Sequence, residues 1–204
     1  MRPDPKDVLF YLARHGTTEL NQEDRFRGPL NVALDEKGRQ DAQELSNFFD
    51  RIKLGGVITS DRNRALETAM AVGDHRDLLP HVEPALRSWN VGYMAGQLKD
   101  EYQDDIKHFV DHPDQKIPQG ESLNQFRQRI RPIFGKAIQA RKQGKPWLLL
   151  GHASVIREAS NVFNAKPDTA LVHPGGAVAV MHTPDGIRSV PIFKPDPDKA
   201  DRFS

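Results

Sequence analysis

Short apolar runs alternate along this chain with longer segments of helical periodicity, and this alternation restricts the fold more than any other feature. The run VLFYLA (8–13) is continuously apolar, as is typical of a strand buried on both faces of a sheet. Two similar runs, GGVIT (55–59) and KPWLLLGH (145–152), each precede a helical pattern. A closing pair of strands is expected in GGAVAVMHT and IRSVPIF, on either side of the turn PDG. This order predicts an α/β fold, a three-layer α/β/α sandwich with a mostly parallel central sheet.

Helices are expected where apolar residues recur at helical spacing. Residues 36–52 place Ala42, Leu45, Phe48, Phe49 and Ile52 on one stripe. A long helix is expected from about Ser122, a suitable N-cap residue, and its stripe extends to Ala137. By contrast, residues 90–118 are polar and irregular, and we interpret them as an insertion over one edge or face of the sheet. The ending from about residue 194 to 204 is polar and rich in proline, which predicts a mobile tail.

Composition excludes several classes of protein. The 204 residues fit a single domain spanning 1–204, and the net charge of +1 provides no overall field that would favour nucleic acid or membranes as partners. The chain has no cysteine, which excludes disulfides, thiolate metal sites and a cysteine nucleophile. The apolar runs are far shorter than the roughly 18 residues of a membrane span, and the opening MRPDPKD lacks the apolar core of a signal peptide. We therefore expect a cytoplasmic protein.

Three segments share one order: an apolar strand, a polar cluster and a helix. They are FYLARHGTT, VITSDRNRA and LLLGHASVIR. Ligands of open α/β sheets bind beyond the carboxyl ends of the strands, so these clusters meet at one site if their strands are neighbours. The resulting pocket would hold Arg14, His15, Arg64 and His152. Two guanidinium groups and two imidazoles, with helix N-termini pointing at the same place, indicate a phosphate site.

The residue types in this pocket suit phosphoryl transfer. Arginine binds two phosphate oxygens at once with its planar guanidinium group and keeps its charge. A neutral imidazole is a competent nucleophile near pH 7 when its other nitrogen is held as a donor, and Gly16 allows backbone to approach His15 closely. The predicted chemistry is attack by His15 on phosphorus, a phosphohistidine intermediate, and its hydrolysis by water.

The stretch RHGTTELNQEDRFRG resembles the signature of the histidine phosphatase superfamily, the phosphoglycerate mutase-like proteins. The resemblance continues in the family's order through RFRGPLNVALDEKGRQDAQ, TSDRNRALETA, GES (120–122) and GHASVIR, and covers roughly residues 8–182. It implies the fold of that family and a phosphorylated His15. It also implies a phosphate pocket of Arg14, Arg64 and His152. Asn21 and Arg25 occupy positions that contact phosphate or the rest of the substrate, and Thr18 offers a hydroxyl nearby.

One segment departs from the family pattern. Family members carry a catalytic glutamate that protonates the leaving oxygen, and the corresponding segment here, LRSWNVGYMAG, has Ser88 at that position. The serine hydroxyl has far too high a pKa for an ordinary general acid, whose contribution is typically about 100- to 10,000-fold in rate. Three explanations are open: another carboxylate replaces the glutamate, the enzyme is slow, or its substrates have good leaving groups. The carboxylate candidates are Glu83, Asp100, Glu101 and Glu121, and a water held by Ser88 and Asn90 is a further one.

These observations favour a phosphomonoesterase that acts through phosphohistidine on a small phosphorylated metabolite, with no metal and no cofactor. Ser88 is counted among the substrate-binding residues, with Thr18, Asn21 and Arg25. HFVDHPD (108–114) offers metal-ligating residue types in an irregular setting, and we do not expect a metal there.

Two alternatives remain open. One is a phosphoglycerate mutase-type phosphotransferase, in which Arg25, Arg27 and Arg87 could supply cationic contacts for a substrate carboxylate. The other is a catalytically weakened, phosphate-binding regulatory protein, which Ser88 favours and the intact phosphate pocket disfavours. The sequence gives neither the natural substrate nor the oligomeric state.

Overall fold

The computed structural model describes residues 4–74, 76–163 and 172–196, and in this part six strands form one sheet. The strand order is β3-β2-β4-β1-β5-β6. β1, β2, β3 and β4 are mutually parallel, and β5 pairs in antiparallel with both β1 and β6, so the prediction of a mostly parallel sheet is confirmed. The strands are β1 (Val8–Arg14), β2 (Val57–Thr59), β3 (His81–Val82), β4 (Leu148–Gly151), β5 (Ala177–Thr183) and β6 (Gly186–Phe193).

The three strands that precede the polar clusters are direct neighbours. β4 lies between β1 and β2, and its Leu148 is in register with Tyr11 on one side and Val57 on the other. All three run in parallel, so their carboxyl ends open at the same edge of the sheet. The predicted convergence of the three clusters is therefore confirmed.

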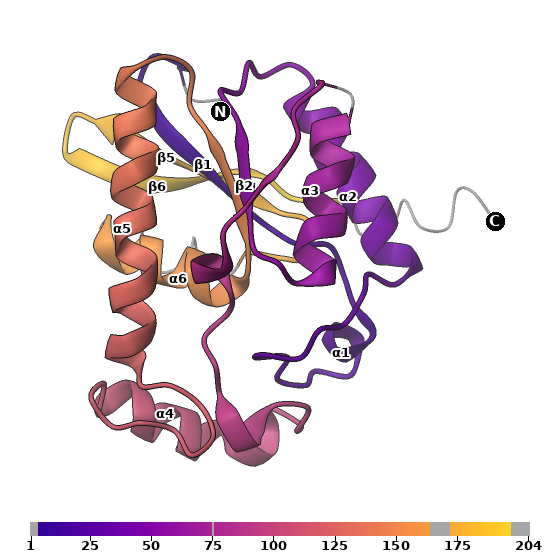
Figure 1. Cartoon of the computed structure of the whole chain (residues 1–204), viewed down its shortest axis with the longest axis vertical. Helices are drawn as coiled ribbons and strands as arrows, with labels where there is room; N and C mark the ends of the chain where they lie inside the picture. Colours follow the sequence, from indigo (N-terminus) through magenta and orange to yellow (C-terminus); the bar gives the residue numbers. More distant parts are fainter. Residues whose placement is uncertain (1–3, 75, 164–171, 197–204) are drawn as a thin grey trace.

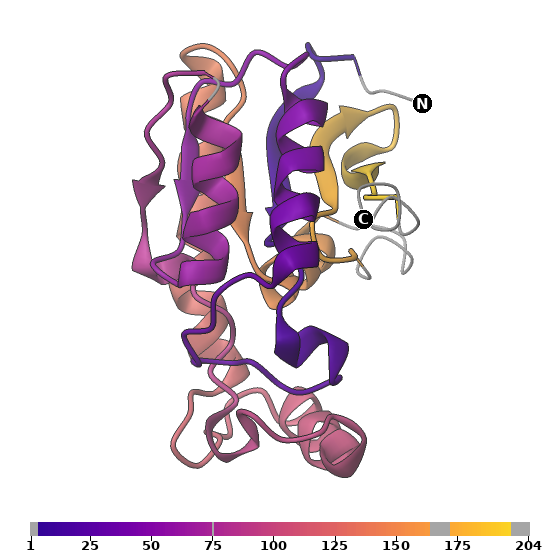
Figure 2. The ribbon, with the colours of Figure 1, turned by 90° about the vertical axis from the view of Figure 1, so that its right-hand side faces the viewer.

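Helices cover both faces of this sheet (Figures 1 and 2). α2 (Glu36–Phe49) and α3 (Asn63–Asp74) cover one face, and α5 (Leu123–Lys142) and α6 (Ala153–Val162) cover the other. Side chains of β1 pack on both faces of the sheet. Leu12 lies in the core beneath α5 and α6, and Ala13 lies in the core beneath α2 and α3. The three-layer α/β/α arrangement is confirmed. None of the described helices combines the length and apolar character that crossing a bilayer requires.

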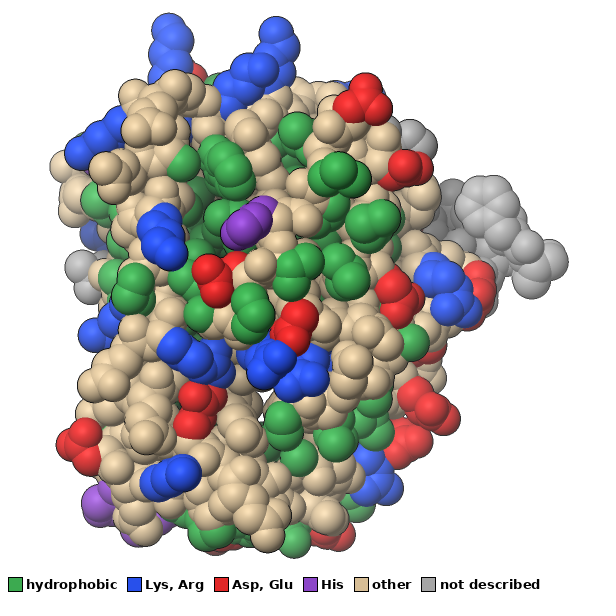
Figure 3. Space-filling model, viewed as in Figure 1, with side chains coloured by type: hydrophobic (Ala, Val, Ile, Leu, Met, Phe, Trp, Pro, Cys, Tyr) green, Lys and Arg blue, Asp and Glu red, His purple; other side chains and the backbone are tan. Residues whose placement is uncertain are grey.

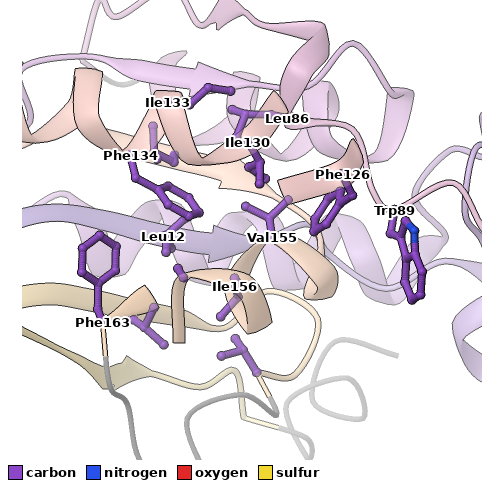
Figure 4. Packing of buried hydrophobic residues seen from close by; sticks show 14 of the residues in the cluster. Leu12, Leu86, Trp89, Phe126, Ile130, Ile133, Phe134, Val155, Ile156 and Phe163 are labelled. Carbon is purple, nitrogen blue, oxygen red and sulfur yellow. The ribbon is translucent and has the colours of Figure 1, made fainter. Parts of the chain in front are cut away.

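The core under α5 and α6 is aromatic and extends beyond the sheet. Phe10 lies between Phe134 and Phe163, with ring centroids 5.9 and 5.8 Å away. Figure 4 shows the cluster continuing from Phe134 and Leu12 past Phe126 toward Trp89 at its far end. Since aromatic side chains bury large apolar areas, this continuous packing fixes the backbone around Trp89 relative to the sheet.

Residues 90–118 are more regular than predicted. They contain two 3₁₀ turns, η2 (Gly92–Met94) and η3 (Asp100–Tyr102), and the helix α4 (Gln103–Asp111), which lie beyond the carboxyl ends of the central strands (Figure 2). The prediction missed α4 because Phe109 is its only buried residue, so its apolar stripe is short. Of the tail predicted to be mobile, 197–204 lie outside the described residues.

The segment from 90 to 118 is joined to the loop after α1 (Glu19–Gln22). The Phe26 amide donates to the carbonyl of Gln97 at 2.9 Å, and the Gly96 amide donates to the carbonyl of Phe26 at 2.7 Å. Arg25 and Leu98 form an isolated β-bridge beside them. The two segments thus build one wall over the ends of the strands.

Candidate active site

Backbone contacts fix the end of β1 in place. The His15 amide donates to the carbonyl of Gly151 at 3.0 Å, and the Gly16 amide donates to Thr68 Oγ1 at 3.1 Å. A Cβ on Gly16 would lie 2.2 Å from the carbonyl oxygen of Gly38, so α2 approaches too closely for any side chain there. Gly16 is therefore required for close backbone approach, as predicted, and His15 stands on a rigid support.

His15 is held as a neutral imidazole with one nitrogen unused by the protein. Its ring is 1% exposed, and Nδ1 lies 2.7 Å from the carbonyl oxygen of Gly16. A carbonyl only accepts hydrogen bonds, so Nδ1 carries the proton and Nε2 presents a lone pair. Burial, followed by the charges of Arg64 and other neighbours, holds the His15 pKa well below its usual value. This is the protonation state that a nucleophile requires.

His152 lies beside His15 at the end of β4. The ring centroids are 5.3 Å apart at an angle of 62°, and His152 Nε2 lies 2.9 Å from the hydroxyl of Ser60. Burial, followed by the charge of Arg64, also lowers the His152 pKa well below its usual value. His152 Nδ1 is buried without a hydrogen-bond partner among the described residues.

Two arginines next to these imidazoles have donors to spare. The fully buried Arg64 donates to the carbonyls of Leu30 at 2.6 Å and Gly28 at 3.3 Å, while Arg14 donates to Val172 at 2.8 Å. Within the described residues, the buried Nε of each has no acceptor. Burial and the charges of neighbouring arginines lower the pKa of each to about 9. Buried cations without carboxylate partners are costly, so an anion bound here would stabilise all of them.

A pocket of about 150 Å³ opens over these groups. Its lining includes His15, Arg64 and His152, three of the four residues expected to form the phosphate pocket, and also Ser88. Figure 3 shows Lys and Arg side chains gathered between the part of the molecule that holds the sheet and the part that carries α4. The remaining lining residues are Phe26, Arg27, Gly28, Trp89, Val91, Lys99, Ile106, Val110, Ala153, Ser154 and Arg157.

The other predicted site residues lie outside this lining. Arg14 does not line the pocket, but its charge is one of those that lower the His15 pKa. The Thr18 hydroxyl donates to Asn21 Oδ1 at 2.9 Å at the start of α1. The Arg25 guanidinium donates to Glu23 at 2.5 Å and to the carbonyl of Gly96 at 3.0 Å.

Three residues that support the site were missed by sequence reasoning. Ser60 and Thr68 hold His152 and Gly16 by the bonds given above. Asp41 accepts from the Thr17 amide at 3.0 Å and from its hydroxyl at 2.6 Å, and burial raises the Asp41 pKa. The sequence signal for Ser60 was its place directly after a predicted strand, but Thr68 and Asp41 look like ordinary polar residues of a helix.

No carboxylate lines the pocket in the described part of the chain. Of the four candidate acids, Glu83 caps the turn η1 (Pro84–Leu86), Asp100 accepts from Gln103, and Glu121 pairs with Arg129. Glu101 lies on η3 without lining the pocket either. The position expected for the acid is held by Ser88, whose hydroxyl lies 3.1 Å from that of Ser154.

Metal-ligating groups are not clustered in the described residues, where no three His, Cys, Asp or Glu side chains are placed to hold an ion. In the segment that offered such residue types, His108 lies 2.9 Å from Gln115 and Asp111 pairs with Lys107.

Comparison with known proteins places this geometry in a family. A model of the histidine phosphatase superfamily (branch 1) matches residues 10–183. The chain belongs to this superfamily. A probable phosphoglycerate mutase GpmB of Erwinia tasmaniensis is 30% identical over 151 residues, which are 72% of this chain and 70% of the relative.

Solved structures of other proteins share the fold. Mycobacterial glucosyl-3-phosphoglycerate phosphatase Rv2419c, in its complex with VO3, superposes with a TM-score of 0.74 at 22% identity, covering 92% of this chain and 99% of the other. TTHB049 from Thermus thermophilus gives a TM-score of 0.71 at 27% identity, covering 90% and 99%. The superfamily is one of catalytic proteins, phosphatases and mutases, and Ser88 is where this member departs from the expected motif.

Proposed function

We propose that this chain is a phosphomonoesterase that hydrolyses a small phosphorylated metabolite through a phosphohistidine at His15. One observation carries the proposal. A buried, neutral His15 has its Nδ1 bound to backbone, and its free Nε2 lies in a pocket shared with Arg64 and His152. A nucleophile and fixed phosphate donors are sufficient for this reaction, so we propose that it needs no metal or cofactor. A cytoplasmic location and a single domain over residues 1–204 complete the proposal.

The reaction divides into two displacements at phosphorus. His15 Nε2 forms a bond to phosphorus while the bond to the ester oxygen breaks, and the departing alkoxide takes up a proton from water. A second water then attacks the phosphohistidine, releasing inorganic phosphate and one proton and restoring neutral His15. We assign the stabilisation of the phosphoryl oxygens in both steps to Arg64 and His152, which line the pocket, and to Arg14, whose buried Nε has no acceptor among the described residues.

Residues around the phosphate end would contact the remainder of the substrate. We assign substrate binding to Ser88, which lines the pocket, and to Thr18, Asn21 and Arg25 through the loop that begins with α1. Arg25 supports that assignment by joining the loop to Gly96 of the opposite segment.

The proposal is tested by phosphate release from a panel of aryl, sugar and glycerate phosphates. We expect turnover by the native protein, unchanged by chelators, and none above background by His15→Ala. The matched control is His112→Ala, since His112 is exposed and does not line the pocket, and its activity should equal that of the native protein. Equal inactivity of native and His15→Ala proteins on the whole panel would exclude this function.

A mutase is the second candidate, favoured by the 30% identity to a probable phosphoglycerate mutase and by the extra cations Arg27, Lys99 and Arg157 in the pocket. A mutase would exchange phosphate between positions of phosphoglycerate faster than it would release inorganic phosphate. Ser88 favours a third candidate, a phosphate-binding regulatory protein. That protein would be stabilised against heat by vanadate or phosphate, with no turnover of any substrate.

A further inference from the structure

The pocket has two walls of different origin. The ends of β1 and β4 and the start of α3 supply His15, His152 and Arg64, which hold the phosphoryl group. The opposite wall comes from the loop after α1 and from the segment joined to it by the Phe26 bonds, and it supplies Arg27 and several apolar side chains. Because the nucleophile lies on the first wall, the leaving group of a bound substrate lies against the second.

Among the described residues, no carboxyl group lines the pocket, and the position expected for the acid holds only hydroxyl groups. The Ser88 and Ser154 hydroxyls lie 3.1 Å apart, and Ser154 Oγ also accepts from the Trp89 amide at 3.1 Å. An efficient general acid needs a pKa near the working pH, and an aliphatic hydroxyl is many units above it. These hydroxyls can bind a leaving group but cannot neutralise it.

Two carboxylates on segments that adjoin Ser88 are occupied as hydrogen-bond acceptors. Glu121 accepts from the Asn90 amide at 2.9 Å and from Arg129 at 2.5 and 3.0 Å, so N–H donors occupy both of its oxygens. Asp61 pairs with Arg87, and this bond lowers the Asp61 pKa below its usual value. Both carboxylates pair with an arginine, and neither lines the pocket.

The second wall, which faces the leaving group, carries a positive charge and no carboxylic acid among the described residues. Arg27 lines the pocket and is half-buried, and its hydrogen bond to the carbonyl of Arg25 is a long one, at 3.5 Å. Burial lowers the Arg27 pKa to about 10, which leaves it charged at neutral pH. A partly desolvated guanidinium with donors to spare stabilises an oxyanion strongly, without transferring a proton to it.

On the basis of the proposed phosphatase chemistry, we propose that this site is selective for phosphoryl groups bonded to an oxygen that departs as a stable anion. Such substrates are acyl phosphates and phosphoanhydrides, and Arg27 is the specificity residue that stabilises the departing anion. His15 Nε2 bonds to phosphorus, and the phosphorus–oxygen electron pair leaves with a carboxylate or a phosphate. Neither leaving group needs a proton. Water then hydrolyses the phosphohistidine as before. Alkyl monoesters are turned over slowly, because their alkoxide must leave unprotonated.

The test is the dependence of kcat/KM on leaving-group acidity. The series is glycerol phosphate, phenyl phosphate, 4-nitrophenyl phosphate, pyrophosphate and acetyl phosphate, each corrected with His15→Gln for uncatalysed hydrolysis. We expect acetyl phosphate or pyrophosphate to exceed glycerol phosphate by at least about 1,000-fold, since a missing acid costs about 100- to 10,000-fold on the poor leaving group alone. Preference for acetyl phosphate over pyrophosphate, or the reverse, identifies which anhydride the pocket accepts.

Ser88→Glu adds the missing acid, and Ser88→Gln is its control of equal size without a titratable proton. We expect Ser88→Glu to narrow the acetyl phosphate to glycerol phosphate ratio by at least about tenfold and to make glycerol phosphate hydrolysis decline at alkaline pH. Ser88→Gln should do neither. Arg27→Gln should lower activity most on the least acidic leaving groups, where the most charge accumulates on the departing oxygen.

Two failures are distinguishable. Turnover that depends on His15 but varies little with leaving-group acidity would overturn this inference and leave the phosphatase proposal standing. Absence of His15-dependent turnover across the series would overturn both. If Ser88→Glu does not fold, as judged by its thermal unfolding, the native series still decides the question.

Discussion

Acidification should destabilise this fold through the two buried imidazoles of the candidate active site. His15 and His152 are 1% and 2% exposed, and burial with nearby arginine charge lowers the pKa of both well below 6.5. In the unfolded chain each imidazole takes up a proton near pH 6.5, whereas in the folded protein it stays neutral. The unfolded state therefore binds more protons below pH 6.5. Their contribution to stability is complete above that pH and is lost as the pH falls toward the folded pKa.

The magnitude follows from one proton per imidazole. Between pH 7.5 and 5.5, a group with an unfolded pKa of 6.5 that stays neutral when folded reduces the free energy of unfolding by about 1.4 kcal/mol. His15 and His152 together should account for about 2.7 kcal/mol of the loss. Carboxylates titrate mostly below this range, and they contribute equally to all the variants compared.

Urea unfolding at pH 7.5, 6.5 and 5.5 measures this loss. The variants are His15→Asn, His152→Asn and the double substitution, and the control is His112→Asn at an exposed position. Each single substitution should reduce the loss by about 1.4 kcal/mol and the double by about 2.7 kcal/mol, with the control unchanged. If the double variant lost as much stability as the native protein, the imidazoles would be charged in the fold. The neutral nucleophile would then be wrong.

Four further substitutions test the packing, the ion pairs and the hydrogen bonds of the fold. Gly38→Ala should lower the free energy of unfolding in urea by about 1–3 kcal/mol, because the new Cβ would lie 2.0 Å from the backbone oxygen of Thr17. Gly135→Ala is the control: its Cβ would have no atom within 4 Å, and the free energy of unfolding should rise by about 0.5–1 kcal/mol. Glu158→Gln removes a buried carboxylate that pairs with two partly exposed arginines of α5. Thermal unfolding should show a loss of stability of about 1–3 kcal/mol. An unchanged stability would mean that these ion pairs do not stabilise the fold. Ser60→Ala should lower kcat about fivefold with KM unchanged, the equivalent of about 1 kcal/mol for the bond that orients His152, and steady-state phosphate release would show it.

The sheet and the phosphate end of the pocket were predictable because their determinants are local. A continuous apolar run such as VLFYLA is typical of a strand buried on both sides, and the residue after such a strand lies at the edge of the sheet. His15 and His152 were therefore placed correctly by their position after β1 and β4. The stripe of α2 was also predicted, although the helix ends at Phe49 and Ile52 lies beyond it.

The supports of the site were not predictable because they depend on contacts between distant segments. Thr68 lies four residues after Arg64 on α3, where a threonine suggests nothing more than a polar helix position. Its hydroxyl accepts from the Gly16 amide and donates to the carbonyl of Arg64, which ties the segment after β1, where His15 lies, to the helix that carries Arg64. This function exists only once β1 and α3 lie side by side.

The pocket wall that carries Arg27 also depends on contacts between distant segments. Substrate specificity is therefore harder to predict from the sequence than the type of reaction. Arg27 enters the pocket because the loop after α1 pairs with residues 96–98, a contact between segments about 70 positions apart that no periodicity indicates. The phosphoryl donors can be recognised from strand ends, but the groups that meet the leaving oxygen come from two loops joined only in the folded state. On the proposed function, a single substitution beside those loops, such as a serine at position 88, would change which phosphate bonds are broken while the phosphate-binding end stays intact. Exchanging Ser88 for Glu should then shift selectivity between leaving groups more than it shifts the affinity for inorganic phosphate as a competitive inhibitor.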